Sequence, residues 1–315
     1  IHQFSPDDTD LYLADKLLNI TPKIEEYLRK KIERVYSDEA RTGIFEEDNP
    51  FLEMISDDLL ETSVAVANRW KEEFVVSENQ KTNDLVFIQF SKEGVDHFAF
   101  LRIALRETLT HLGGEVDNPI KLTQNNLPGF GTGADEALVI NLQSRKYHLI
   151  EKRIKYNGTF LNYFSENLLQ AQPKISPKKS IKALEKTAQK IAESFNTDDF
   201  QFQSKVKSAI FNHIEEENKL SPEKLADDLF DDNLTARLSF IDQVKEAVPE
   251  PVTFEEIDAS RQLKKFENQK LSLSNGIELI VPNNVYEDAE SVEFILNENG
   301  TYSILIKNIE DIQSK

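Results

Sequence analysis

Strand-like runs in this chain follow one another directly, and helical runs then follow helical runs. Two alternating apolar stretches, residues 84–90 and 95–105, are separated by Lys92-Glu93-Gly94, a turn sequence that predicts an antiparallel pair. Residues 137–142 form another strand-like run after a glycine-rich loop. A doubly wound parallel sheet needs a regular alternation of strands and helices. The order of elements therefore predicts an α+β fold.

Amphipathic helices are predicted before these strands as well as after them. The first begins after Thr21, a residue type that caps helices, with Pro22 in the first turn, where proline is favoured. Apolar residues from Ile24 to Ile32 then recur at helical spacing. Residues 51–74 are predicted to form one or two further helices.

The pattern is helical from about residue 150 to residue 248. Its first part is predicted to be an amphipathic helix that carries Phe160, Leu161, Phe164, Leu168 and Leu169. A longer helix is predicted to begin at Pro177, with Ser176 as its cap. An apolar seam runs along this helix through Ile181, Leu184, Ala188, Ile191 and Phe195, beside a cationic stripe of Lys178, Lys182, Lys186 and Lys190. Further helices are predicted over residues 202–217, 222–230 and 234–248.

Two Asn-Gly pairs mark the last part of the chain, beyond a boundary at Pro249-Glu250-Pro251. Asn275-Gly276 and Asn299-Gly300 each lie between alternating apolar runs, which is the strongest short-range signal for a β-hairpin. The sequence thus predicts three regions: an N-terminal domain that mixes helices with an antiparallel sheet (1–150), a central helical region (151–248) and a small C-terminal subdomain rich in β-hairpins (252–312).

Charge is distributed unevenly along the chain. The whole sequence carries −19 at pH 7, yet residues 145–190 carry +8, between flanks of −13 and −14. An acidic chain is repelled by polyanions as a whole, so one concentrated positive stretch suggests a local site for a polyanion. We call this stretch the basic island, and its Lys and Arg residues are Arg145, Lys146, Lys152, Arg153, Lys155, Lys174, Lys178, Lys179, Lys182, Lys186 and Lys190.

Patterns typical of catalytic and metal sites are absent from the sequence. It has no cysteine, its five histidines are scattered, and no serine lies in a nucleophile elbow. The loop Gly129-Phe-Gly131-Thr-Gly133-Ala134 fits only the loosest dinucleotide pattern and lacks the strand–loop–helix context, so we predict a connecting loop. No apolar run approaches the ~18 residues of a membrane-spanning helix. We expect no enzyme activity, no catalytic residue, no metal, no cofactor and no membrane contact.

The basic island has two interpretations. It is either a solvated lysine face that balances acidic neighbours or a surface that contacts nucleic-acid phosphates. Ammonium groups are point charges without a fork geometry, so lysines neutralise a phosphate backbone without reading bases. The island has two arginines, and no aromatic residues are interleaved with its lysine stripe, which disfavours base-specific and single-strand stacking modes. DNA binding by the island would therefore show little sequence preference.

Several segments carry a family resemblance. They are Ile1-His2-Gln3 with Leu17-Leu18, Arg34-Val35-Tyr36-Ser37 before Gly43-Ile44-Phe45, and Arg261-Gln262-Leu263-Lys264-Lys265-Phe266 leading into Leu271-Ser-Leu273. Residues 147–169, basic and then aromatic, are a weaker match. In this order the segments resemble the bacterial nucleoid-associated proteins of the NdpA/YejK type, over most of the chain. None of these segments is a catalytic signature.

The resemblance implies a cytoplasmic, nucleoid-located protein that binds double-stranded DNA without strong sequence preference. Similar proteins are linked to type II topoisomerases as partners. Our leading hypothesis is a DNA-binding protein whose eleven island residues contact phosphates, acting as a homodimer because a second copy doubles the contacts. The alternative is an acidic adaptor that docks on a DNA enzyme such as a type II topoisomerase, with the basic island as a docking surface.

Overall fold

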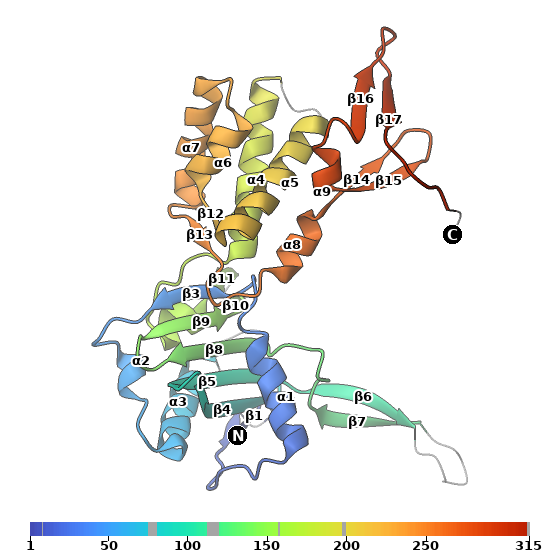
Figure 1. Ribbon diagram of the computed structural model, residues 1–315. Coiled ribbons are helices and arrows are strands. Elements are labelled where there is room, and N and C mark those ends of the chain that lie inside the picture. Colours follow the sequence, from blue (N-terminus) through green and yellow to red (C-terminus); the bar gives the residue numbers. More distant parts are fainter. Residues whose placement is uncertain (8, 75–80, 112–119, 157, 197–199, 314–315) are drawn as a thin grey trace. The chain divides into compact units, whose positions relative to one another are not determined.

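The computed structural model describes the chain except for residues 8, 75–80, 112–119, 157, 197–199 and 314–315. The chain divides into two compact units, Ile1–Ser176 and Pro177–Lys315 (Figure 1). The first unit encloses two hydrophobic cores, one on each face of its sheet, and the second unit encloses one. An antiparallel sheet with helices, followed by helices and small hairpins, confirms the predicted α+β class. The three predicted regions, 1–150, 151–248 and 252–312, remain a hypothesis about which parts fold independently.

A seven-stranded antiparallel sheet organises the first unit. Glu93 and Gly94 connect its two longest strands with positive φ angles of 55° and 79°, the conformation of a tight hairpin turn, which confirms the predicted antiparallel pair. In order across the sheet the strands are β2 (Asp10–Tyr12), β1 (His2–Ser5), β4 (Asn83–Lys92), β5 (Val95–Ala104), β8 (Glu136–Asn141), β9 (Lys146–Ile150) and β3 (Arg41–Ile44).

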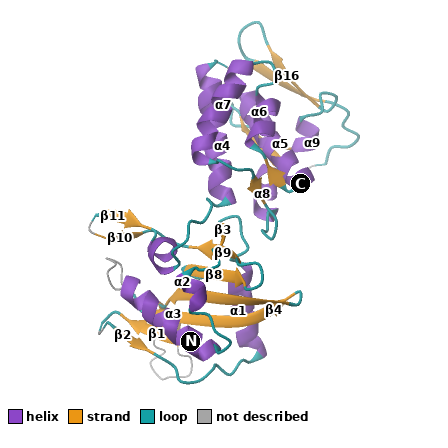
Figure 2. Ribbon diagram, turned by 90° about the vertical axis from the view of Figure 1, so that its left-hand side faces the viewer, coloured by secondary structure: helices purple, strands orange, loops and turns teal. Residues whose placement is uncertain are grey.

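Helices cover both faces of this sheet, as Figure 2 shows for the first unit. Side chains alternate along β5, so that Phe98 and Phe100 enter one core while Ala99 and Leu101 enter the other. Burial on both faces explains why β5 is apolar almost throughout. One face is covered by α1 (Pro22–Glu33), and the other by α2 (Pro50–Glu53), α3 (Leu59–Phe74) and a π-helical turn, η1 (Phe164–Leu168).

The predicted start of α1 is confirmed. The Thr21 hydroxyl accepts a hydrogen bond from the Ile24 backbone N–H at 3.5 Å, and Pro22 occupies the first helical position. Leu28 and Ile32 are buried on the side of the helix that faces the sheet. Cap, proline and apolar spacing therefore agree, as expected for a helix that packs on one face.

Two smaller hairpins complete the first unit, and the sequence pattern predicted neither. β6 (Arg106–His111) pairs with β7 (Ile120–Asn126), and β10 (Ile154–Tyr156) pairs with β11 (Thr159–Leu161). Both are two-stranded and lie outside the main sheet.

The predicted amphipathic helix over residues 160–169 is wrong. Phe160 belongs to β11, where it is 61% exposed and pairs with Lys155 of β10. Gly158, between the two strands, has a φ of 79°, a left-handed conformation that favours a turn. The helical spacing of the apolar residues misled the prediction, because only the part within η1 is helical and buried.

Five helices build the core of the second unit, and their burial confirms the predicted seam. Ile181, Leu184 and Ala188 are at most 1% exposed and pack in this core. The later predicted helices are confirmed to within two residues at each end. The five helices are α4 (Pro177–Ser194), α5 (Phe200–Glu217), α6 (Pro222–Leu229), α7 (Leu234–Ala247) and α8 (Ser260–Phe266).

Both predicted C-terminal hairpins are confirmed. Leu271 pairs with Leu279 in the first, and Phe294 pairs with Ile304 in the second. The turn glycines, Gly276 and Gly300, have φ angles of 87° and 78°. The elements of this part are the short pair β12 (Lys219–Leu220) and β13 (Val252–Thr253), then β14 (Asn268–Ser272), β15 (Glu278–Pro282), α9 (Asn283–Tyr286), β16 (Val292–Leu296) and β17 (Tyr302–Ile306).

Candidate nucleic-acid interface

The eleven predicted DNA contacts are divided between the two units. The division falls after Ser176, within the basic island, so each part of the island belongs to a separate compact unit. The first unit holds Arg145, Lys146, Lys152, Arg153, Lys155 and Lys174. The second unit holds Lys178, Lys179, Lys182, Lys186 and Lys190, all on α4.

The α4 lysines form an exposed row. The buried seam fixes how the helix is rotated about its own axis, and the opposite side must then face solvent. Four residues advance about 6 Å along a helix, so lysines at every fourth position spread their ammonium groups over about 18 Å. All five lysines of α4 are exposed. The predicted cationic stripe therefore exists as one surface within the second unit.

A groove of about 480 Å³ lies between α4 and α5. Lys182, Glu185 and Lys186 line it from α4, and Lys207 lines it from α5. Gln189 and Gln203 add amide groups, which can donate hydrogen bonds to phosphate oxygens. In the described part of the chain, no carboxylate lies within ion-pair distance of any of these three lysines. The sequence pattern missed Lys207 because it lies outside the island, and its only signal was the four-residue spacing from Gln203.

Two of the three acidic residues within the basic island are neutralised by cations from outside it. Glu185 on α4 forms an ion pair with Lys265 of α8 at 3.2 Å. Glu151, whose side chain is 3% exposed, pairs with Arg41 and accepts hydrogen bonds from the backbone N–H and hydroxyl of Ser165 at 3.0 and 2.9 Å. The negative charges that could oppose a phosphate are thus partly cancelled where the lysines lie.

In the first unit, part of the basic island is already engaged with carboxylates. Arg145 lies 3.7 Å from Glu47, and Lys152 lies 2.8 Å from Asp135. Although burial opposes the shift, hydrogen bonds from Lys152 and from a backbone N–H lower the pKa of Asp135 below its usual range. Exposed island residues without a carboxylate partner among the described residues of this unit are Lys146, Arg153 and Lys155.

Lys174 is fixed through its backbone near the end of the first unit. Its N–H donates to the Thr42 carbonyl at 2.8 Å, and its carbonyl accepts from the Arg41 guanidinium at 3.4 Å. The side chain of Lys174 is exposed. β3 therefore sets the position of this lysine.

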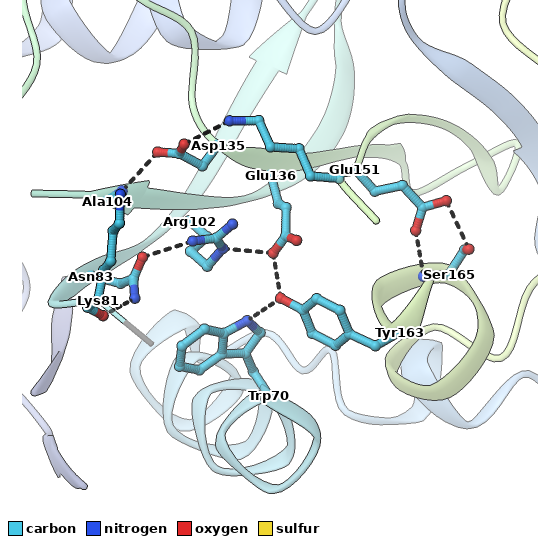
Figure 3. Close-up of polar contacts among 11 residues, drawn as sticks. Trp70, Lys81, Asn83, Arg102, Ala104, Asp135, Glu136, Glu151, Tyr163 and Ser165 are labelled. Carbon is cyan, nitrogen blue, oxygen red and sulfur yellow. Dashed lines mark hydrogen bonds and ion pairs between the residues drawn. The ribbon is translucent and has the colours of Figure 1, made fainter. Parts of the chain in front are cut away.

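A buried polar network lies between the sheet of the first unit and the helices on one of its faces (Figure 3). Arg102 donates to Glu136 at 2.6 Å and to Asn83 at 2.8 Å. The Tyr163 hydroxyl donates to Glu136 and accepts from the Trp70 indole N–H at 3.1 Å. Burial raises the pKa of Tyr163 well above its ordinary value. Each of these five side chains is at most 9% exposed, so the network joins elements and offers no access to a substrate.

The glycine-rich loop between β7 and β8 is a connecting loop, as predicted. The carbonyl groups of Gly129 and Thr132 accept hydrogen bonds from the ammonium of Lys31, a residue that is fully buried. A phosphate-binding loop presents backbone N–H groups to its ligand, whereas this loop directs carbonyl oxygens at a cation. The loop therefore serves to hold α1.

Neither a metal site nor a membrane-spanning helix is found in the described parts of the chain. Within them, no three His, Asp or Glu side chains gather as metal ligands. No helix there is both long enough and apolar enough to cross a bilayer. His2 lies in the core, where its Nε2 is 2.9 Å from the Ser63 hydroxyl.

The model of the family described as nucleoid-associated protein YejK matches residues 1–312. The chain belongs to this family. None of the curated proteins compared with the chain matches it. The YejK family is a family of nucleoid-associated proteins and is not a known enzyme family.

The segments that carry the YejK resemblance have clear structural roles. Gly43 of β3 pairs with Tyr147 of β9, and a Cβ at Gly43 would lie 2.3 Å from the Tyr147 hydroxyl, so only glycine fits. Phe45 packs 4.4 Å from the Tyr147 ring. In the C-terminal segment, Phe266 is buried in the core of the second unit while Lys265 pairs with Glu185. This segment thus also supplies the cation that neutralises Glu185 on α4.

Proposed function

We propose that this protein binds double-stranded DNA through phosphate contacts, with little sequence preference and without catalysis. In this proposal α4 is the principal contact, extended by Lys207, and the basic residues of the first unit add further contacts. The protein would act in the cytoplasm on the nucleoid as a homodimer that combines the basic surfaces of its two copies. Membership of the YejK family supports nucleoid association, and the contacts themselves are the proposal.

The observation that carries this proposal is the exposed lysine row on α4, on a helix whose rotation is fixed by a buried seam. Lys182 and Lys186 have no carboxylate partner among the described residues, and the acid between them, Glu185, is held by Lys265. Exposed ammonium groups such as those of Lys182 and Lys186 suit a phosphate backbone, which offers repeated charge and does not require a fork-shaped donor.

The number of available lysines sets the expected salt dependence. Each neutralised phosphate contributes about −0.9 to the slope of log affinity against log salt concentration. Six contacts, five on α4 and one from Lys207, give a slope of roughly −5 per subunit. Such a slope is expected for binding through phosphate contacts, whereas binding without them would depend little on salt.

The test is fluorescence anisotropy with a random-sequence duplex of about 30 base pairs, titrated at several salt concentrations. Lys182→Glu/Lys186→Glu should abolish most of the binding and flatten the salt slope. Lys219→Glu/Lys245→Glu is the matched control, because both residues are exposed lysines of the same unit outside the groove and the change in net charge is identical. The control should keep most of the wild-type affinity.

Equal losses in the two variants would assign the binding to net charge and contradict a site on α4. An affinity that does not change with salt would contradict phosphate contacts altogether. Circular dichroism of each variant separates loss of the surface from loss of the fold.

A second candidate function is an acidic adaptor that docks on a DNA enzyme such as a type II topoisomerase. The observation in its favour is that both units are strongly negative: residues 1–176 carry 20 basic and 29 acidic side chains, or −9, and residues 177–315 carry 17 and 27, or −10. Such surfaces fit the positive DNA-binding groove of an enzyme. Capture of topoisomerase that survives nuclease treatment would favour the adaptor, and capture that depends on DNA would favour direct DNA binding.

A further inference from the structure

The two C-terminal hairpins of the second unit enclose a groove of about 900 Å³. Leu271 and Leu279 line it from the first hairpin, Phe294 and Ile304 line it from the second, and Phe200 of α5 lines its base. All five side chains are half-buried, so the groove has apolar walls that remain open to solvent, and polar side chains such as Gln203 and Ser272 also line it. Each hairpin has only two strands, and an isolated hairpin is marginally stable. A covered groove would stabilise both.

The charge of the groove is unusual for this chain. Its lining includes Lys207 and Lys270, and none of the described residues that line it is acidic, although the chain carries −19. No described carboxylate lies within ion-pair distance of either lysine. The groove therefore suits an occupant that is apolar and acidic. Most of its apolar lining is aliphatic, which favours a peptide over nucleic acid, because bases stack on aromatic faces.

The chain itself contains a segment of this chemistry. Residues 308–313 follow β17 and have no helix or strand structure. Ile309 and Ile312 are 52% and 82% exposed, and Glu310 and Asp311 lie between them. Six extended residues span about 20 Å, close to the roughly 17 Å of the five-residue strands that wall the groove. Because the isoleucines are exposed, the segment does not fill the groove of its own chain.

We infer that residues 308–313 of a second copy of this chain occupy the groove. Ile309 and Ile312 point to opposite sides of the extended segment and contact different walls, and Glu310 and Asp311 meet Lys207 and Lys270. In the dimer Lys207 is therefore paired, and the phosphate contacts are those of α4. Each copy has one segment and one groove, so the exchange can be mutual between two copies or can run head to tail along a chain of copies. The inference is the mutual exchange, which closes as a two-fold symmetric dimer.

The first test is the oligomeric state of the full chain in the absence of DNA. Sedimentation equilibrium from about 1 µM to about 100 µM should show a reversible dimer. Ile309→Ser/Ile312→Ser should raise its dissociation constant at least about tenfold. Leu234→Ser/Leu238→Ser is the matched control, because these residues are 60% and 54% exposed on α7 of the same unit, and it should leave the dimer unchanged.

A charge exchange tests the pairing directly. Lys207→Glu/Lys270→Glu and Glu310→Lys/Asp311→Lys should each weaken the dimer, whereas the variant that combines all four changes should restore it. Restoration requires that the two groups meet, which an effect on folding or on net charge does not produce.

Three results would overturn the inference: a wild-type chain that stays monomeric throughout, a dimer insensitive to the isoleucine changes, or a fourfold variant weaker than both double variants. Because DNA is absent, failure here is independent of the proposed DNA binding. A monomer that still binds duplex would contradict this inference and the proposed homodimer, and would leave the proposed phosphate contacts in place.

Discussion

Two basic residues of the first unit differ from two central lysines of α4 in what they contact. In the first unit Arg145 and Lys152 are paired with carboxylates. On α4, by contrast, Lys182 and Lys186 have no carboxylate partner in the described part of the chain, although they lie in the same run of sequence. Density of charge along a sequence therefore overstates the surface available to a polyanion, since a paired cation must give up its partner before it binds a phosphate.

The largest expected effect concerns a cation used entirely inside the first unit. Arg102→Leu leaves Glu136 buried without its charge partner, and we expect a loss of about 3 to 5 kcal/mol in the free energy of unfolding. Urea unfolding followed by the fluorescence of Trp70, the only tryptophan and a neighbour in this network, measures it. A loss below about 1 kcal/mol would mean that Glu136 is solvated or neutral without Arg102.

The second prediction compares lysines that have no carboxylate partner in the described part of the chain with cations that have one. Lys179→Gln/Lys182→Gln/Lys186→Gln should flatten the salt slope of DNA binding by roughly 2.7, because three phosphate contacts are lost. Arg145→Gln/Lys152→Gln should change the slope by less than about 1, because both cations already have partners. The measurement is duplex anisotropy over a range of salt concentrations. If the paired residues changed the slope by about 1.8, pairing would not limit their contact with DNA.

The sequence predicted the helices and hairpins whose signal is local, in the spacing of apolar residues or in a turn sequence. Helix α4 was predictable because Pro177 marks its start and because its seam and its stripe repeat at intervals of three and four residues. The C-terminal hairpins were predictable because Asn-Gly between two alternating apolar runs strongly favours a tight hairpin turn. The stretch 160–169 was mispredicted because its apolar spacing suits a helix, whereas Gly158 and the strand pairing decide the outcome.

The composition of the candidate site depended on tertiary packing and was predicted only in part. Lys207 reaches the groove because α5 packs against α4, and Lys265 reaches Glu185 from α8, which lies about eighty residues further along the chain. Neither the position of Lys207 nor that of Lys265 can be derived from the spacing of residues along the sequence. The same reasoning holds for the pairs of Arg145 and Lys152, whose partners Glu47 and Asp135 lie in loops elsewhere in the first unit.

The third prediction uses a buried histidine of the first unit. Burial lowers the pKa of His2 to about 4, below an ordinary value of about 6.5. Between these two pH values the unfolded chain therefore binds more protons than the folded chain. The free energy of unfolding should fall as the pH drops from about 6.5 to about 4, and at lower pH this residue should not reduce it further. His2→Asn should reduce the dependence of the free energy of unfolding on pH in this range. Trp70 fluorescence in urea at several pH values measures it, and an unchanged slope would assign the acid sensitivity to other groups.

The smallest expected effect concerns the ion pair between Glu185 and Lys265. Both side chains are partly exposed, at 27% and 53%, so breaking the pair should cost less than about 0.5 kcal/mol of stability. DNA affinity should respond more clearly, because Lys265→Gln uncovers a carboxylate beside Lys182 and Lys186 and should weaken binding a few-fold. Glu185→Gln should strengthen binding slightly, and the double variant should return it near wild type. If Lys265→Gln lowered affinity as much in the Glu185→Gln background as it does in the wild-type protein, Lys265 would be a direct phosphate contact. Helix α8 would then belong to the interface that α4 and α5 form.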